Sequence, residues 1–150
     1  MIRRCFTNKS AGVITPLYKT LVRPIIENCS PAWDPWLQKD IAQLDKVQQR
    51  CINMANNPLL LEPLTLRRQK ADLVETYKQI NGMYKCPSLL HTKEVRTRGH
   101  SARLPKAHTR TEVRQHFFTN RVVNKWNKLP ESTVTAPSIQ SFKDRLELTT

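Results

Sequence analysis

Histidine and cysteine side chains are the first candidates for chemistry in this sequence. Cys86, His91, His100, His108 and His116 follow one another, with eight or nine residues from one histidine to the next. Zinc ligands in structural sites usually come in closely spaced pairs that include cysteines. The spacing here fits no such pattern, so the sequence predicts no metal site and no cofactor.

The acidic residues are not grouped in a way that would support catalysis. Asp34, Asp40, Asp45 and Asp72 stand singly on the surfaces or at the caps of expected helices, whereas two-metal catalysis needs clustered carboxylates. No Ser or Cys has the surroundings of a nucleophile elbow, and 3 Gly are too few for a phosphate-binding loop. We therefore expect no catalysis by this chain on its own.

Positive charge is the most pronounced chemical property of the chain. Its 25 Lys and Arg against 12 Asp and Glu give a formal net charge of +13. Residues 91–128 hold ten Lys or Arg against Glu94 and Glu112, which is a net charge of +8. This balance predicts affinity for polyanions such as RNA, DNA or an RNA–DNA hybrid.

The candidate contacts to phosphate are cations of this basic stretch: Arg96, Arg98, Arg103, Lys106, Arg110, Arg114, Arg121 and Lys125. Each of them could also be an ordinary solvated charge. Phosphate contacts carry no sequence information directly, so we expect binding without strong sequence preference.

Trp126 lies among these cations and could stack on a base. It shares a helical face with Phe118 and Val122. We therefore expect it to be packed between the last two helices.

Periodic apolar residues predict two helices in the first third of the chain. The first helix begins at Thr15 and Pro16 and runs to Cys29, with a kink at Pro24. The second begins with Asp34 as its N-cap and Pro35 in its first turn. Trp33 and Trp36 flank this cap, and we expect them to fill the corner between the two helices.

Three more helices are expected further along the chain. One spans residues 64–82, ends at Gly82, and presents a polar side with Arg67, Arg68, Lys70 and Lys78. The others span residues 111–129, ended by Pro130, and residues 138–148, after Pro137. Between residues 91 and 110 large apolar residues nearly vanish, which predicts a basic, irregular and partly mobile segment.

The predicted fold is therefore mainly α. We expect a small bundle of about five helices, with a basic irregular segment over residues 91–110 in which short strands could pair around Gly99. Residues 1–150 are expected to be a single domain or domain fragment. It has a helical part over 13–82, a basic linker over 83–110 and a C-terminal helical pair over 111–148.

The cysteines and the N-terminus bear on the compartment. Cys5, Cys29, Cys51 and Cys86 are far apart, and no apolar signal region follows Met1. These features predict reduced thiols in a nuclear or cytoplasmic protein that is not secreted. The Arg-rich start is a weak sign of a mitochondrial transit peptide. No apolar run reaches the length of a membrane span, so we expect no membrane partner.

Three blocks of the sequence, in this order, resemble one family. They are LYKTLVRPIIENCSPAWDPWLQKDIAQLDKVQQR, ADLVETYKQING, and a third that begins RTRGHS and continues as TRTEVRQHFFTNRVVNKWNKLPESTVTAPSIQSFKDRL. The chain is similar to the C-terminal end of the reverse transcriptase of non-LTR (LINE-type, jockey-like) retrotransposons. The resemblance covers residues 17–146, although the connection between Arg50 and Ala71 is shorter than is usual in that family.

The resemblance implies a thumb and post-thumb extension that cradles template and primer. The palm of such polymerases, with its Tyr-Ala-Asp-Asp box, precedes the blocks seen here, so the resemblance implies a non-catalytic fragment that could act with an upstream palm. Two other interpretations remain open. One is a helical protein-interaction domain that uses the apolar stripe Leu21, Val22, Ile25 and Ile26. The other is a translated relic without a selected function.

Overall fold

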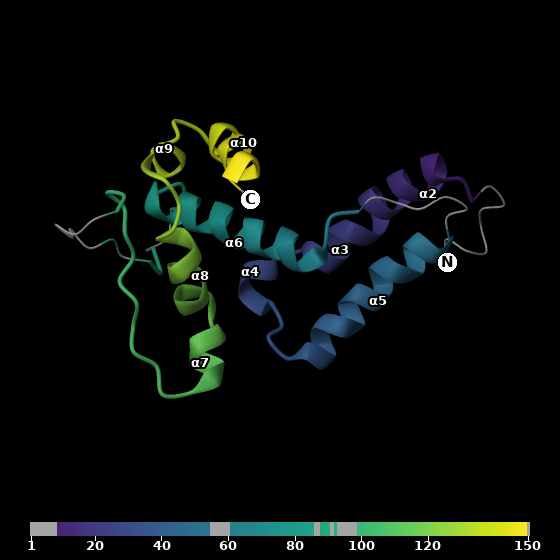
Figure 1. Cartoon of the computed structure of the whole chain (residues 1–150), viewed down its shortest axis with the longest axis horizontal. Coiled ribbons are helices and arrows are strands. Elements are labelled where there is room, and N and C mark those ends of the chain that lie inside the picture. Colours follow the sequence, from purple (N-terminus) through teal and green to yellow (C-terminus); the bar gives the residue numbers. More distant parts are fainter. Residues whose placement is uncertain (1–8, 55–60, 86–87, 91, 93–98, 150) are drawn as a thin grey trace. The chain divides into compact units, whose positions relative to one another are not determined.

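The computed structural model describes residues 9–54, 61–85, 88–90, 92 and 99–149 (Figure 1). In these ranges every regular element is helical and no strand is formed, which confirms the mainly α prediction. The chain divides into two compact units, Met1–Arg68 and Gln69–Thr150. The division falls inside the helix α6 (Leu64–Ile80), so this helix contributes residues to both units.

The first helix of the N-terminal unit consists of three consecutive segments. They are α2 (Ala11–Leu17), the π-helical turn η1 (Tyr18–Val22) and α3 (Arg23–Glu27). The predicted start at Thr15 and Pro16 is wrong, because the helix begins at Ala11 and Pro16 lies inside it.

The disturbance predicted at Pro24 takes the form of the π-helical turn that precedes it. Pro24 has no N–H to bond the carbonyl of Thr20. The backbone N–H of Arg23 bonds the carbonyl of Tyr18, five residues earlier, so the hydrogen-bond register widens by one residue before the proline.

The second predicted helix is shifted toward the C-terminus. A short helix, α4 (Ser30–Trp33), comes first, and α5 (Gln38–Met54) begins later than the predicted Asp34 and Pro35. The carboxylate of Asp34 instead accepts a hydrogen bond from Nε of Arg68 at 2.6 Å. Trp33 is 41% exposed, so the prediction that it fills a corner is wrong. Trp36 is half-buried.

The core of the N-terminal unit is small. Ile14, Tyr18 and Cys51 form its buried centre, and Val22 and Ile26 pack against it partly buried. The hydroxyl of Tyr18 donates to Gln48 at 3.2 Å, and desolvation by burial raises the pKa of this tyrosine.

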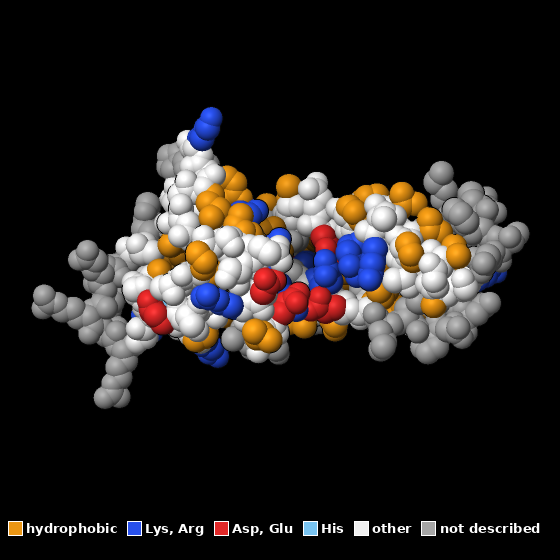
Figure 2. Space-filling view, turned by 90° about the horizontal axis from the view of Figure 1, so that it is seen from above, with side chains coloured by type: hydrophobic (Ala, Val, Ile, Leu, Met, Phe, Trp, Pro, Cys, Tyr) orange, Lys and Arg blue, Asp and Glu red, His pale blue; other side chains and the backbone are white. Residues whose placement is uncertain are grey.

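Other apolar side chains of this unit remain open to solvent. Leu21 is 53% exposed and Ile25 is 78% exposed. Figure 2 shows several apolar side chains at the surface in its right-hand part, where α2 lies.

The helix α6 (Leu64–Ile80) forms as predicted over residues 64–82. Gly82 has φ +63°, its N–H bonds the carbonyl of Gln79, and the N–H of Met83 bonds the carbonyl of Lys78. These two bonds are a Schellman motif, which needs a residue in the left-handed region at Gly82. A local sequence signal therefore determines this boundary.

After α6, the described residues of the C-terminal unit form four helices. They are α7 (Glu112–His116), α8 (Phe118–Trp126), α9 (Glu131–Val134) and α10 (Ile139–Thr149). The single helix predicted over residues 111–129 is wrong, because Phe117 is extended (φ −64°, ψ 145°) and separates α7 from α8. The sequence does not predict α9, whereas α10 confirms the helix predicted over residues 138–148.

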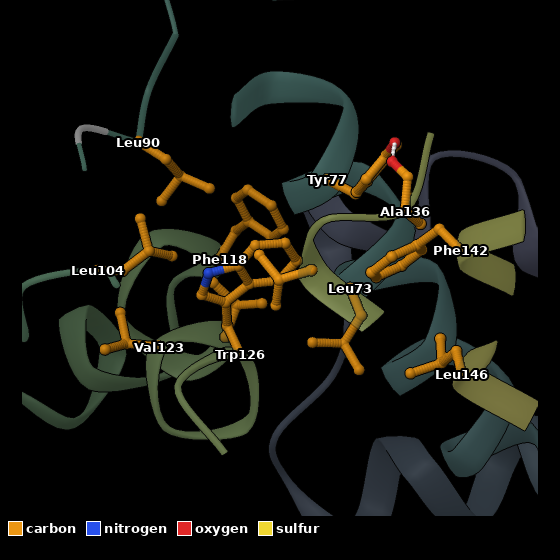
Figure 3. Packing of buried hydrophobic residues seen from close by; sticks show 12 residues of the cluster. Leu73, Tyr77, Leu90, Leu104, Phe118, Val123, Trp126, Ala136, Phe142 and Leu146 are labelled. Carbon is orange, nitrogen blue, oxygen red and sulfur yellow. Dashed lines mark hydrogen bonds between the residues drawn. The ribbon is translucent and has the colours of Figure 1, made fainter. Parts of the chain in front are cut away.

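The larger core belongs to this unit, and Trp126 lies in it. Trp126 is 0% exposed, and its ring centroid is 6.0 Å from that of Phe142 on α10. Phe142 in turn stacks on Tyr77 of α6 at 4.5 Å. Figure 3 shows these rings together with the aliphatic side chains around them. The expectation that Trp126 is buried is confirmed.

Candidate nucleic-acid interface

A short strap, residues 99–104, is bound to the end of α8. Nε2 of His100 donates to the carbonyl of Trp126 at 3.0 Å, since a carbonyl oxygen can only accept. The indole N–H of Trp126 donates to the carbonyl of Ala102 at 2.8 Å. The side-chain amide of Asn127 bonds both the N–H and the carbonyl of Leu104, at 3.0 and 2.9 Å.

The strap also contributes a side chain to the hydrophobic core. Leu104 is 4% exposed and belongs to the same cluster as Val123 and Trp126. The strap is therefore fixed on α8, so this part of the basic, partly mobile segment predicted over residues 91–110 is held in place. The strand pairing expected around Gly99 is absent from the described part of this segment, and residues 93–98 lie outside it.

Glu131, the first residue of α9, also bonds to the strap. Its two carboxylate oxygens accept from the hydroxyl and the N–H of Ser101, at 2.7 and 2.8 Å. The side-chain hydrogen bond from Ser101, followed by its backbone hydrogen bond, lowers the pKa of Glu131. This acidic group thus contributes a structural contact in a basic region.

Gly99 begins the strap in a conformation that favours glycine. Its φ is +131°, and a Cβ placed there would lie 3.1 Å from Cδ of Arg103. Arg103, one of the candidate contacts, therefore lies half-buried over the backbone of Gly99.

The basic surface consists of exposed cations that follow the strap: Lys106, Arg110, Arg114, Lys125 and Lys128. Four of these are predicted phosphate contacts, and Lys128 is an addition. Across residues 99–128 the sequence holds one acidic residue, Glu112. In the described residues no carboxylate pairs with Lys106, Arg110 or Lys128. Arg96 and Arg98 lie outside the described residues.

Arg121 is placed differently from the other candidates. Its Nε and Nη2 both bond the carboxylate of Asp72 at 2.8 Å, and its side chain is 15% exposed. A two-pronged ion pair of this kind orients both groups. Arg121 therefore joins α8 to α6 within the unit, and the basic surface does not include it.

The cations predicted on the polar side of the third helix are partly used for structure. Arg68 is 3% exposed and pairs with Asp34. Arg67 bonds both carboxylate oxygens of Glu27, at 2.5 and 2.8 Å, and these hydrogen bonds raise its pKa. These two arginines are thus not exposed cations, in contrast to the prediction.

The exposure of Phe117 is a feature of this region that was not predicted from the sequence. Its position in the sequence predicts the buried face of one long helix, yet it is 45% exposed. A signal was present in the doublet Phe117–Phe118, since neighbouring residues of a helix point about 100° apart at 3.6 residues per turn.

Metal binding and membrane insertion find no support in the described residues. No group of three or more His, Cys, Asp or Glu there could hold a metal ion, and Cys86 and His91 lie outside them. No helix among these residues is long and apolar enough to cross a membrane.

No protein-family model, curated protein or solved structure matches this chain.

Proposed function

We propose that the chain binds the phosphate backbone of RNA, DNA or an RNA–DNA hybrid through the basic surface. The observation that carries the proposal is the exposure of Lys106, Arg110, Arg114, Lys125 and Lys128 where Glu112 is the one acidic residue. Exposed cations attract phosphates and release their counterions on binding.

The source of the chain is part of the same proposal. We infer from the three resembling blocks that it is the non-catalytic thumb and post-thumb portion of a non-LTR retrotransposon reverse transcriptase. In that role the basic surface would hold the template and primer for a palm supplied by the upstream part of the polymerase.

The placement of the acidic groups supports the proposal. Asp72 is paired with Arg121, and Glu131 is bonded to Ser101. These two acidic side chains thus make contacts within the unit, while Lys106, Arg110 and Lys128 are exposed. The strap supports it too, because it fixes the segment leading to Lys106 on the helix that carries Lys125.

The test is a matched pair of charge variants measured by fluorescence anisotropy over a range of salt concentrations. The first variant changes Lys106, Arg110, Arg114 and Lys125 together to Gln. The control changes Lys19, Lys39, Lys46 and Arg50 to Gln, which removes the same charge from exposed positions of the N-terminal unit.

The first variant should flatten the dependence of log K on log salt by up to about three to four units, at about 0.7–0.9 per phosphate contact. The control should change it much less. Affinities for unrelated sequences of equal length should lie close together. Equal effects of the two variants would mean that only net charge matters and would refute the basic surface as the site.

A second candidate function is a docking site for a protein. The exposure of Leu21 and Ile25 favours it, because large exposed apolar side chains in a stripe often mark an interface. Size-exclusion chromatography with and without nuclease separates the two functions. Nucleic acid that copurifies supports the basic surface, whereas self-association that survives nuclease supports the apolar stripe.

A further inference from the structure

Phe117 combines exposure with a fixed position. It stands between α7 and α8 and is 45% exposed, while its neighbour Phe118 is 6% exposed and belongs to the core. An exposed aromatic ring contributes less hydrophobic stabilisation than a buried one, because less of its area is removed from water.

Backbone contacts of Phe117 hold this position. Its carbonyl accepts from the N–H groups of Asn120 and Arg121, at 2.9 and 3.0 Å, and so begins α8. Its own N–H bonds the carbonyl of Arg114 at 3.4 Å.

Side chains of α8 donate hydrogen bonds to backbone carbonyls at the end of α7. The amide of Asn120, which is 6% exposed, donates to the carbonyl of Arg114 at 2.7 Å. Arg121, tied to Asp72, also donates to the carbonyl of His116 at 3.2 Å. The break in the helix is thus built by buried or paired groups, and it directs the ring of Phe117 away from the core.

One cation, Arg114, lies against the ring. The guanidinium carbon of Arg114 lies 5.2 Å from the ring centroid of Phe117, a cation–π contact. Arg110 is exposed just before α7, and Val113 on α7 is 67% exposed.

We propose that Phe117 is a stacking platform for an unpaired base, so that the ligand of the basic surface is a single-stranded stretch of RNA or DNA. This inference rests on the function proposed above and adds the strand state of the ligand. An aromatic ring beside phosphate-binding cations is the arrangement by which proteins hold single strands without reading their sequence. Bases inside a duplex are already stacked on one another and cannot offer a free face to the ring.

The charge of the surroundings favours this ligand over an apolar protein partner. A base brings its phosphates with it, and Arg114 lies against the ring, where such a phosphate gains from positive charge. Arg110, four residues earlier in the sequence, is exposed as well. A protein surface that covered Phe117 would have to desolvate these cations without a built-in anion.

The test compares Phe117→Leu with Tyr84→Leu in the full chain. Tyr84 is a matched control in the same unit, because it is 40% exposed and has Nζ of Lys78 6.0 Å from its ring centroid. Its hydroxyl donates to Glu75, whose carboxylate disfavours an approaching phosphate.

Phe117→Leu should weaken binding of a single-stranded oligonucleotide by about 5- to 150-fold, the range expected for the loss of one stacked base. Its salt slope should stay unchanged, since no charge is removed. Phe117→Trp should keep the affinity, and Tyr84→Leu should leave it unaltered. A 5-iodouracil oligonucleotide irradiated on the wild-type protein should crosslink to Phe117.

The outcomes separate this inference from the function on which it rests. If the four-cation variant loses its salt slope while Phe117→Leu binds single strands normally, the platform is refuted and the phosphate-binding function stands. If Phe117→Leu weakens binding of duplex and single strand equally, the ring serves another contact and the inference is wrong. If the wild type binds no nucleic acid, the proposed function itself fails.

Discussion

At the scale of single residues, partners far apart in sequence decide which charges and rings are exposed. Trp126 and Trp33 have the same side chain, yet one is fully buried and the other is 41% exposed. Arg121 and Arg114 are both cations near α8, yet of the two only Arg121 is paired with a carboxylate among the described residues.

Trp126→Ala should destabilise the C-terminal unit. Truncating a buried Trp costs about 3–5 kcal/mol, a large part of the stability of a small domain, and the indole N–H bond to Ala102 is lost as well. Thermal unfolding followed by circular dichroism should show a clearly lower melting temperature. Trp33→Ala is the control and should shift it little, because that side chain is partly exposed. Equal shifts would contradict the packing described for Trp126.

Glu131 makes the strap sensitive to acid. Its pKa in the folded chain lies below the ordinary value of 4.5, because the hydroxyl and N–H of Ser101 bond the ionised form. Because folding lowers this pKa, the contact stabilises the fold at pH values above the pKa of Glu131 in the unfolded chain. This stabilisation is lost as the pH falls through the pKa of Glu131 in the folded chain. The amide resonance of Ser101 should therefore titrate with an apparent pKa below 4.5. In Glu131→Gln this titration should vanish; a midpoint at or above the ordinary value would disprove the contact.

At the scale of elements, glycine substitutions separate local backbone requirements from packing. Gly82 has φ +63°, and a Cβ added there would meet nothing within 4 Å, so Gly82→Ala is disfavoured by backbone strain alone. This strain costs roughly 1–2 kcal/mol. Gly12 lies in α2 with equal space and no positive φ, so Gly12→Ala should instead stabilise by roughly 0.5–1 kcal/mol. Urea unfolding of the two variants should give opposite signs, and a shared sign would contradict one of these helix assignments.

Elements whose boundaries depend on local signals were predictable from the sequence. The end of α6 follows from Gly82, and the start of α10 follows from Ser138, whose hydroxyl accepts from the N–H of Ser141 at 3.2 Å. Both signals involve residues only a few positions apart, so their effect could be predicted without the fold.

Elements whose boundaries depend on distant partners were not predictable. The break at Phe117 relies on Arg121, which is oriented by Asp72, 49 residues away in sequence. The carboxylate of Asp34 serves Arg68, 34 residues away, instead of capping α5. The same limit applies to the site: the sequence indicated a basic surface, but only the fold distinguishes exposed Lys106 from paired Arg121.

At the scale of the whole molecule, the proposed function predicts that the chain binds nucleic acid without extending it. We expect the purified chain to show no template-dependent, Mg²⁺-dependent incorporation of nucleotides, because two-metal catalysis needs clustered carboxylates and the acidic residues stand apart in the sequence. A primer-extension assay on homogeneous protein tests this. Incorporation that survives repurification would overturn the non-catalytic interpretation.

The core of the C-terminal unit is formed by residues that precede and residues that follow a mostly exposed segment, residues 106–110. Lys106 and Arg110 are exposed and lie outside any helix, where trypsin would find an extended chain. Leu73, Tyr77 and Leu104 precede this segment, whereas Phe118, Trp126 and Phe142 follow it, and all six share one core (Figure 3). A tryptic nick there should therefore leave two fragments that stay associated as a folded complex until denaturant parts them. Two fragments expressed separately and divided at this segment should therefore reassemble into the folded C-terminal unit when they are mixed.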